Sequence, residues 1–293
     1  MRSNFVAIVG EANAGKSTLL NNILREKVSI VSPKAQTTRS NIHGIKIIGD
    51  TQIVFIDTPG FCRVKSNIGR ILDKNTKSAY RSSDTILVVI DGASANNTGI
   101  LKFLEGIQSA KDCNVIIAIN KVDIAKRESI LEIASYIKDF NFVKNTFMIS
   151  AKDGDGIPDL EKCLVDIAKD SVWYYPAEQV TDSNIQFRLA EITREKIFLL
   201  LMRELPYSIY VETESFKETD SKVIINQAIV ASKQNHKMII IGKDSSMIKE
   251  IKRRAVIDMK NVLGGKNVTL KLFVKIEKDW DIKKEHLRNA CLV

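Results

Sequence analysis

The chain has 293 residues and a formal net charge of +9 at pH 7, so we expect two domains and an anionic partner. Its four cysteines are scattered without a C-x-x-C pair, which argues against zinc and disulfides. No apolar run approaches the roughly 20 residues that span a membrane, and the N-terminus leads straight into an apolar strand without room for a signal peptide, so we expect a cytosolic protein.

The first apolar run, Phe5 to Val9, predicts a buried strand that leads into a glycine-rich loop. The loop matches the G-x-x-x-x-G-K-[ST] pattern, in which backbone N–H groups and the next helix N-terminus bind phosphate. Lys16 is expected to reach the β- and γ-phosphates, and the Ser17 hydroxyl to bind Mg²⁺. A glycine turn that binds nothing is the alternative, but the flanking elements favour a nucleotide site lined by Gly10, Glu11, Ala12, Asn13, Ala14, Gly15, Lys16, Ser17 and Thr18.

A polar loop from Ser32 to Arg39 follows and contains two adjacent threonines. A switch loop needs a hydroxyl that completes the Mg²⁺ shell when the γ-phosphate is present. Thr38 is the predicted Mg²⁺ ligand, and Thr37 is the alternative. An ordinary solvated loop would have a similar composition.

A second apolar run, Ile53 to Ile56, predicts another strand, and it ends in the string Asp57-Thr58-Pro59-Gly60. An Asp at this place holds Mg²⁺ through water in many nucleotide-binding proteins. Gly60 can bring its backbone N–H close to the γ-phosphate because it has no Cβ. Without the phosphate loop the same string would indicate an ordinary turn.

The residue after this glycine is Phe61, although many GTPases have a glutamine there that orients the attacking water. Catalysis must then depend on the backbone, metal ions and positioning, so we expect slow intrinsic hydrolysis. The residues predicted to be catalytic are Lys16, Thr38 and Gly60.

A third motif, Asn120-Lys121-Val122-Asp123, is predicted to recognise the base of the nucleotide. It follows a predicted strand over Val115 to Ile119. The Asp123 carboxylate can accept hydrogen bonds from guanine N1–H and the exocyclic amine, whereas adenine offers no such pair. Asn120 is expected to tie this loop to the phosphate loop, and Lys121 to lie over the base. A weaker motif, Ser150-Ala151-Lys152, would place the Ala151 N–H near guanine O6.

Strands and helices alternate from Phe5 to about Lys169, with further elements predicted at Thr85–Asp91, 130–140 and 160–168. This alternation predicts an α/β P-loop GTPase domain with a mostly parallel sheet and helices on both faces. The pattern then changes, and the polar stretch that follows ends in a helix cap. We predict a GTPase domain over 1–172, a linker over 173–184 and a second domain over 185–293.

The second half predicts a smaller α+β domain. An apolar pattern between Phe187 and Leu205 indicates a helix, and a polar turn at 219–221 joins two predicted strands. An apolar stretch from Met238 to Gly242, a helix from about Ser246 to Val262 and a final strand come next. The predicted order is α-β-β-α-β, with strands over 207–214, 222–232 and 268–276.

The segment from Ile241 to Ile248 is similar to the GXXG loop of K-homology domains, which clamps the backbone of single-stranded nucleic acid. The second glycine of that pattern is Ser245 here. Basic residues follow the loop and suit phosphate contacts, although a solvated basic helix face is a common alternative. The predicted RNA-binding residues are Ile241, Gly242, Lys243, Asp244, Ser245, Lys249, Lys252 and Arg253.

Taken together, the chain resembles the Era family of bacterial GTPases, which act in ribosome assembly. The resemblance covers nearly the whole chain and rests on the four nucleotide motifs and on further strings at 34–39, 194–197, 204–208 and 241–245. It implies a P-loop GTPase domain followed by a type II K-homology domain. It also implies binding of the 3′ end of 16S rRNA and a role in assembly of the small ribosomal subunit.

The resemblance carries further expectations about cofactors and partners. Asn13 would help to hold a monovalent cation, K⁺, beside the phosphates, with a loop-stabilising amide as the alternative. We also expect the protein to bind Mg²⁺, GTP or GDP, and the 30S precursor. It is expected to be a monomer. Peripheral contact with the inner membrane is reported for the family. A nucleotide-regulated scaffold whose basic domain binds anionic lipid is the alternative function.

Overall fold

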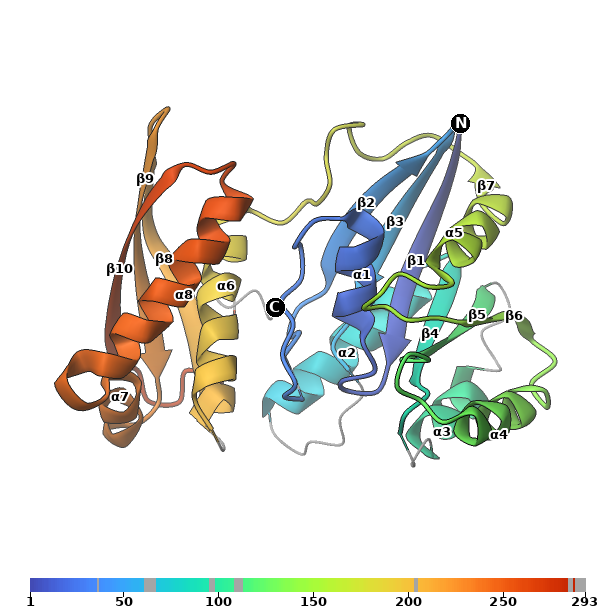
Figure 1. Cartoon of the computed structure of the whole chain (residues 1–293), viewed down its shortest axis with the longest axis horizontal. Helices are drawn as coiled ribbons and strands as arrows, with labels where there is room; N and C mark the ends of the chain where they lie inside the picture. Colours follow the sequence, from blue (N-terminus) through green and yellow to red (C-terminus); the bar gives the residue numbers. More distant parts are fainter. Residues whose placement is uncertain are drawn as a thin grey trace. The chain divides into compact units, whose positions relative to one another are not determined.

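The computed structural model describes residues 1–35, 37–60, 67–94, 98–107, 113–202, 205–283 and 287. The chain forms two compact units (Figure 1). Unit 1 comprises residues 1–31 and 38–182, and unit 2 comprises residues 32–37 and 183–293.

Unit 1 is built around a mostly parallel sheet with the strand order β2-β3-β1-β4-β5-β6, in which β2 is antiparallel to β3 (Figure 1). The short strand β7 pairs antiparallel with the start of β1. In chain order the elements of unit 1 are β1 (Arg2–Gly10), α1 (Lys16–Leu24), β2 (Ile42–Ile48), β3 (Thr51–Asp57), α2 (Asn67–Arg81), β4 (Thr85–Asp91), α3 (Thr98–Ile107), β5 (Asn114–Asn120), α4 (Arg127–Ile137), β6 (Val143–Met148), α5 (Ile157–Asp166) and β7 (Lys169–Asp170).

The central strands have apolar residues on both sides because helices cover both faces of the sheet. On β1, Val6 and Ile8 pack in one core cluster with residues of α1 and α5. Ala7 and Val9 point to the other face and pack in a second cluster with residues of α2, α3 and α4. This arrangement confirms the predicted fold class, and it brings the carboxyl ends of β1, β3, β4 and β5 to one edge of the sheet.

The segment predicted to be a linker is fixed to unit 1 as far as Asp182. The Gln52 side chain donates to the Tyr175 carbonyl at 2.8 Å and accepts from the Tyr174 N–H at 2.8 Å. Further along, the Ile45 N–H donates to the Val180 carbonyl at 2.8 Å. The last polar residues of this stretch therefore lie along β2 and β3.

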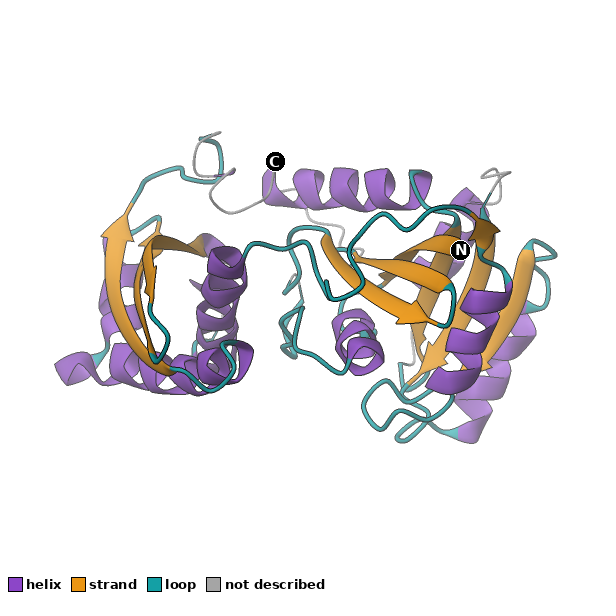
Figure 2. Ribbon diagram, turned by 90° about the horizontal axis from the view of Figure 1, so that it is seen from above, coloured by secondary structure: helices purple, strands orange, loops and turns teal. Residues whose placement is uncertain are grey.

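Unit 2 contains a three-stranded sheet with the order β10-β9-β8. Strands β8 and β9 are antiparallel, whereas β9 and β10 are parallel, and helices α6 and α8 pack on the sheet (Figure 2). In chain order the elements are α6 (Ile185–Leu200), the 3₁₀ turn η1 (Leu205–Ser208), β8 (Ile209–Glu218), β9 (Lys222–Ala231), α7 (Gln234–Ile241), the 3₁₀ turn η2 (Lys243–Ser245), α8 (Ser246–Val262) and β10 (Asn267–Ile276).

The order of elements in unit 2 corrects the sequence prediction, because a helix, α7, stands between β9 and α8. Its last residues are the apolar stretch from Met238 to Ile241, to which the predicted order gave no element. Within that stretch Ile240 is fully buried while Met238 and Ile239 are 60% and 52% exposed, so only one side of the segment faces the core. The order is α-β-β-α-α-β, and Gly242 is the C-cap of α7.

None of the helices in the described part of the chain combines the length and the apolar character that crossing a bilayer requires.

Candidate functional site

The glycine-rich loop lies at the carboxyl end of β1, between the ends of β3 and β4, where Ile8 is paired with Asp57 and Gly10 with Val89. It runs into helix α1 through two residues with left-handed backbone, Asn13 at φ +64° and Gly15 at φ +98°. A Cβ on Gly15 would lie 2.2 Å from Nδ2 of Asn120. Glycine is therefore required here both by the backbone conformation and by the close approach of the neighbouring loop.

Lys16 is the first residue of α1, and its side chain is enclosed by the loop. It is 6% exposed, and its Nζ donates to the carbonyls of Gly10 at 3.0 Å and Glu11 at 2.8 Å. Burial lowers the pKa of Lys16 to about 8, against the opposing charges of Asp57 and Glu11. An ammonium in such a desolvated place interacts more strongly with an anion than it would in water.

Asp57 lies at the end of β3 and is fully buried. Its Oδ2 accepts hydrogen bonds from the hydroxyls of Ser17 and Ser29, each at 2.7 Å, whereas its Oδ1 has no hydrogen-bond partner. Burial raises the pKa of this carboxyl, although the hydroxyls of Ser17 and Ser29 oppose the shift. A buried carboxylate oxygen without a donor, beside hydroxyl oxygens, is the donor set that a hard cation such as Mg²⁺ prefers.

The two adjacent threonines take different partners. The Thr38 hydroxyl lies 2.9 Å from Ser17 Oγ and 3.5 Å from Asp57 Oδ2, so it belongs to the same cluster of oxygens. The Thr37 hydroxyl instead donates to the Lys34 carbonyl at 2.7 Å and lies 2.6 Å from Ser32 Oγ. The geometry thus brings Thr38, the predicted ligand, to the candidate metal site and places Thr37 elsewhere.

The residues after Asp57 approach the glycine-rich loop closely. Thr58 donates its hydroxyl to the Ile8 carbonyl at 2.8 Å, and the Pro59 carbonyl accepts from Thr76 of α2 at 3.1 Å. A Cβ on Gly60 would lie only 2.7 Å from Ala12 Cα. The glycine therefore permits this approach. Gln36 and Phe61 lie outside the described residues.

Asn120, at the end of β5, connects two other loops. Its Nδ2 donates to the Ala14 carbonyl at 2.7 Å, and its Oδ1 accepts from the Ala151 N–H at 2.8 Å. The next residue, Lys121, has φ +67° and pairs with Asp91 at 2.6 Å. Asp123 is exposed, as is required of a carboxylate that meets a base from outside.

The loop at 150–152 is held by its own side chains and by α1. The Ser150 hydroxyl donates to Asp153 at 3.1 Å and accepts from the Asp153 N–H at 3.1 Å. The Asn22 side chain donates to the Ala151 carbonyl at 3.1 Å. Ala151 is 2% exposed and Lys152 is exposed, and the bond from the Ala151 N–H to Asn120 brings this loop next to the end of β5.

Sequence reasoning missed Ser29, which donates to the same Asp57 oxygen as Ser17. The side chain of Asn21 holds Ser29 in place, because its Oδ1 accepts the Ser29 N–H at 2.9 Å and its Nδ2 donates to the Ser29 carbonyl at 2.7 Å. The available signal was a small polar residue between two apolar ones, Val28 and Ile30.

Lys34 and Thr37, which belong to unit 2, are both held by helix α6. Lys34 Nζ donates to the carbonyls of Phe198 and Leu201 near the carboxyl end of that helix, and desolvation lowers the pKa of Lys34. Arg194 is 2% exposed and donates from Nη2 to the Thr37 carbonyl at 2.5 Å. The predicted switch segment thus has specific partners that its sequence did not reveal.

The loop between α7 and α8 in unit 2 has three residues with positive φ: Gly242 at +72°, Asp244 at +51° and Ser245 at +59°. A Cβ on Gly242 would lie 2.8 Å from the Met247 Cβ and 2.9 Å from the Met247 nitrogen, so a side chain there would collide with the start of α8. Ser245 takes up the left-handed backbone that glycine adopts at no steric cost. The loop geometry is therefore formed with serine at the second glycine position.

The charges around this loop are not equally available. Lys243, Lys249 and Lys252 are exposed, and Lys249 Nζ donates to the Asp244 carbonyl at 3.3 Å. Arg253 and Arg254 both pair with Glu250, at 2.8 and 2.6 Å, and hydrogen bonds from these two arginines lower the pKa of Glu250 to about 2. Among the described residues around the loop, the exposed Lys243, Lys249 and Lys252 are therefore the cations without an acidic partner. Ile241, another predicted RNA-binding residue here, is half-buried.

Comparison with known proteins gave matches over both halves of the chain. Residues 5–121 match a family described as 50S ribosome-binding GTPase, and residues 204–281 match the KH domain family. The GTPase Era of Rhizobium meliloti is 40% identical over 292 residues, which cover 99% of this chain and 93% of that protein. The GTPase Era of Caldanaerobacter subterraneus is 38% identical, with 98% and 96% covered.

Solved structures that match the chain over its full length include two of Era. One is Era in complex with MgGDPNP and nucleotides 1506–1542 of 16S ribosomal RNA, with a TM-score of 0.93, 34% identity, and 100% of this chain and 99% of the other covered. The second is Aquifex aeolicus Era bound to GDP and AlF₄⁻, with a TM-score of 0.93, 34% identity and 100% of both chains covered.

Replacing Asp57 by Asn should remove the dependence of nucleotide binding on Mg²⁺. The amide keeps the shape of the side chain but loses the charge that the cation needs. We expect Mg²⁺ to raise the affinity of the wild-type protein for a GTP analogue, and this gain to fall by about 10–100-fold in Asp57→Asn. Titrations with Mg²⁺ and with EDTA would measure the gain. Asp50→Asn, the same change at an exposed carboxylate, is the control, and an undiminished gain in Asp57→Asn would contradict the assignment.

Replacing Ser245 by Gly should stabilise unit 2, since a left-handed residue with a Cβ costs about 1–2 kcal/mol. Ser246→Gly is the matched control, because Ser246 has φ −65° in the first turn of α8, where glycine costs about 0.5–1 kcal/mol. Urea unfolding would be followed by the fluorescence of Trp280, which is buried in unit 2, in a Trp173→Phe background. If Ser245→Gly lowered the free energy of unfolding as much as the control, the strain at Ser245 would be refuted.

Proposed function

Because this chain belongs to the family of the GTPase Era, we propose that it is a GTP-hydrolysing RNA-binding switch. It binds the 3′ end of 16S rRNA and assists assembly of the small ribosomal subunit. The observation that carries the proposal is the presence, on one chain, of a nucleotide site built from all four motifs and a KH loop beside exposed lysines. The solved structure of Era with MgGDPNP and a segment of 16S rRNA supports it.

In unit 1 each motif has a role in nucleotide binding. Backbone N–H groups of the glycine-rich loop and the Lys16 ammonium bind the phosphates. Ser17 and Thr38 would hold Mg²⁺ through their hydroxyls, and Asp57 would act through water. The ion neutralises charge on the phosphates when it is bound. Asp123 selects guanine, because a competing adenine would leave the carboxylate unpaired.

Hydrolysis depends on Lys16, Thr38 and Gly60, which bring an ammonium, a hydroxyl and a backbone N–H to one place. The close approach of Gly60 to the phosphate-binding loop supports this role, since a Cβ on Gly60 would lie 2.7 Å from Ala12 Cα and 3.1 Å from Lys16 Nζ. Asn13 is exposed and stands in that loop with left-handed backbone. It would supply its side-chain oxygen to K⁺ beside the phosphates, in the position where other GTPases use a cationic side chain.

In unit 2 the loop from Gly242 to Ser245 clamps the backbone of single-stranded RNA. Lys243, Lys249 and Lys252 supply phosphate contacts, and Arg253 adds one when it releases Glu250. We further propose that the protein acts as a monomer in the cytoplasm. Its basic surface would also permit peripheral contact with the anionic face of the inner membrane.

The proposal predicts sequence-selective RNA binding that depends on the bound nucleotide. A short single strand matching the 3′ end of 16S rRNA should bind more tightly than a scrambled strand, and more tightly with a GTP analogue than with GDP. Fluorescence anisotropy with labelled strands would measure both differences. Weak binding that is indifferent to RNA sequence and to nucleotide would refute the function.

Within the same assay, Gly242→Asp should weaken binding of the matching strand by at least about tenfold, because the side chain meets Met247 and adds a negative charge. GTP affinity should stay unchanged. Gly264→Asp is the matched control, since Gly264 also has positive φ, lies in the same unit and has open space around its Cβ. Equal RNA affinities in the two variants would show that the loop is not the clamp.

Asn13→Ala should abolish stimulation of GTP hydrolysis by K⁺ while leaving GTP affinity in place. Single-turnover hydrolysis in K⁺ and in Na⁺ would give the ratio of rates for each protein. The expected ratio falls to about one in the variant, because the cation loses its side-chain ligand. Asn141→Ala, at an exposed asparagine of the same unit, serves as the control. An Asn13→Ala variant that keeps the full K⁺ stimulation would leave Asn13 as a loop-stabilising amide.

A further inference from the structure

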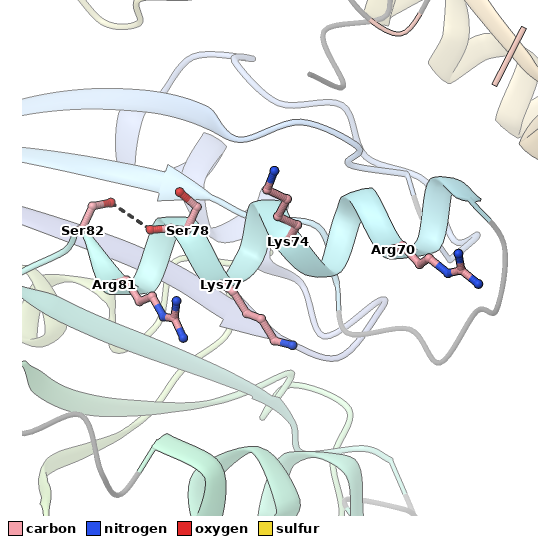
Figure 3. Close-up of a pocket in the computed structure, with 6 residues that line it drawn as sticks. All are labelled: Arg70, Lys74, Lys77, Ser78, Arg81 and Ser82. Carbon is pink, nitrogen blue, oxygen red and sulfur yellow. Dashed lines mark hydrogen bonds between the residues drawn. The ribbon is translucent and has the colours of Figure 1, made fainter. Parts of the chain in front are cut away.

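Helix α2 carries a row of cations that the nucleotide site and the KH loop do not use. Arg70, Lys74, Lys77 and Arg81 are all exposed, and they follow one another at intervals of four, three and four residues. At about 100° per residue these positions fall within about 60° of arc. Figure 3 shows the four side chains on α2 with Ser78 and Ser82, and together they line a hollow of about 620 Å³.

The opposite side of α2 is buried and packs against the rest of unit 1. Leu72, Thr76 and Ala79 are 3%, 3% and 2% exposed, and they fix α2 against unit 1. The basic row therefore points away from the core by construction. The same buried side holds the helix to the loop after β3, because the Thr76 hydroxyl donates to the Pro59 carbonyl at 3.1 Å.

Three of these cations have no acidic partner among the described residues. In the part of the chain that the structure describes, no carboxylate pairs with Arg70, Lys74 or Arg81, in contrast to Arg253 and Arg254, which share Glu250. Lys77 completes the row and has an interaction of its own. Like charges held side by side on one helix face repel one another, so an external polyanion would relieve the repulsion.

From this geometry we infer that the basic face of α2 is a second RNA-binding surface, which contacts the phosphate backbone of a structured part of ribosomal RNA. This inference rests on the proposed function, because it adds a contact to an RNA already bound at the KH loop. The row extends about 16 Å along the helix axis, and a nucleic-acid duplex presents a phosphate charge about every 1.7 Å of its axis. Several phosphates can therefore meet the row at once.

The composition of the face favours RNA over a membrane. A helix that binds a bilayer surface inserts exposed apolar side chains beside its cations. No described side chain of α2 is among the large apolar residues exposed at the surface. Ser78 instead places a hydroxyl beside the cations, and this hydroxyl can donate to a phosphate oxygen, whereas the Ser82 hydroxyl donates to the carbonyls of Ser78 and Ala79.

The test compares two variants of the full chain that lose the same number of positive charges. One combines Arg70→Gln, Lys74→Gln and Arg81→Gln. The matched control combines Arg127→Gln, Lys138→Gln and Lys144→Gln, at exposed positions of unit 1 away from α2. The probes are the short strand matching the 16S rRNA 3′ end, a protein-free transcript of 16S rRNA, and phosphatidylglycerol vesicles.

We expect wild-type protein and both variants to bind the short strand equally. On the transcript, the α2 variant should lose about tenfold in affinity, and the slope of log affinity against log salt should fall by about 2–3. The control should stay close to wild type. This combination would support the second surface, since only a specific set of phosphate contacts distinguishes two variants of equal charge.

Two results would overturn the inference. Equal affinities of the α2 variant and the control on the transcript would show that α2 makes no specific contact. A loss by the α2 variant on vesicles alone would assign the face to a membrane. A wild-type protein that fails to bind the short strand would instead overturn the proposed function, and the transcript comparison would still decide the role of α2.

Discussion

The nucleotide site depends on the two hydrogen bonds of the Asn120 side chain. One amide group joins the phosphate loop through Ala14 to the 150–152 loop through Ala151. Both bonds are buried, so the loss of either would leave a polar group without a partner in the protein interior. The same contact explains why residue 15 is glycine, since Nδ2 occupies the space of a Cβ. The Asn120 side chain therefore joins the phosphate-binding loop directly to the base-binding loop.

The parts of the site that sequence reasoning could place are those whose chemistry is local. Gly15, Lys16 and Ser17 follow from one contiguous pattern, and the alternation of strands and helices brought the carboxyl ends of β1, β3 and β5 to one edge. Asn120 was expected to reach the phosphate loop because of the pattern around it. For these residues the motif itself specifies the geometry.

Other features depend on long-range packing that a pattern of residue types does not encode. Ser29 donates to Asp57, which lies 28 positions further along the chain. No residue next to Ser29 in the sequence indicates this partner. Helix α7 was missed because four consecutive apolar residues suit a strand as well as a helix end. The stretch before Asp182 was interpreted as a linker on its polar composition, yet β2 and β3 supply its partners. Glu250 pairs with Arg253, which was predicted to bind RNA, and with the neighbouring Arg254.

The boundary between the two units passes between consecutive residues, Thr37 and Thr38. The Thr38 hydroxyl lies among the oxygens of the candidate metal site, and the Thr37 carbonyl accepts from Arg194. Their Cα atoms are about 3.8 Å apart across a rigid peptide bond. A displacement of Thr38 must therefore be taken up by the backbone dihedrals of Thr37 and Thr38, or it reaches the carbonyl that accepts from Arg194.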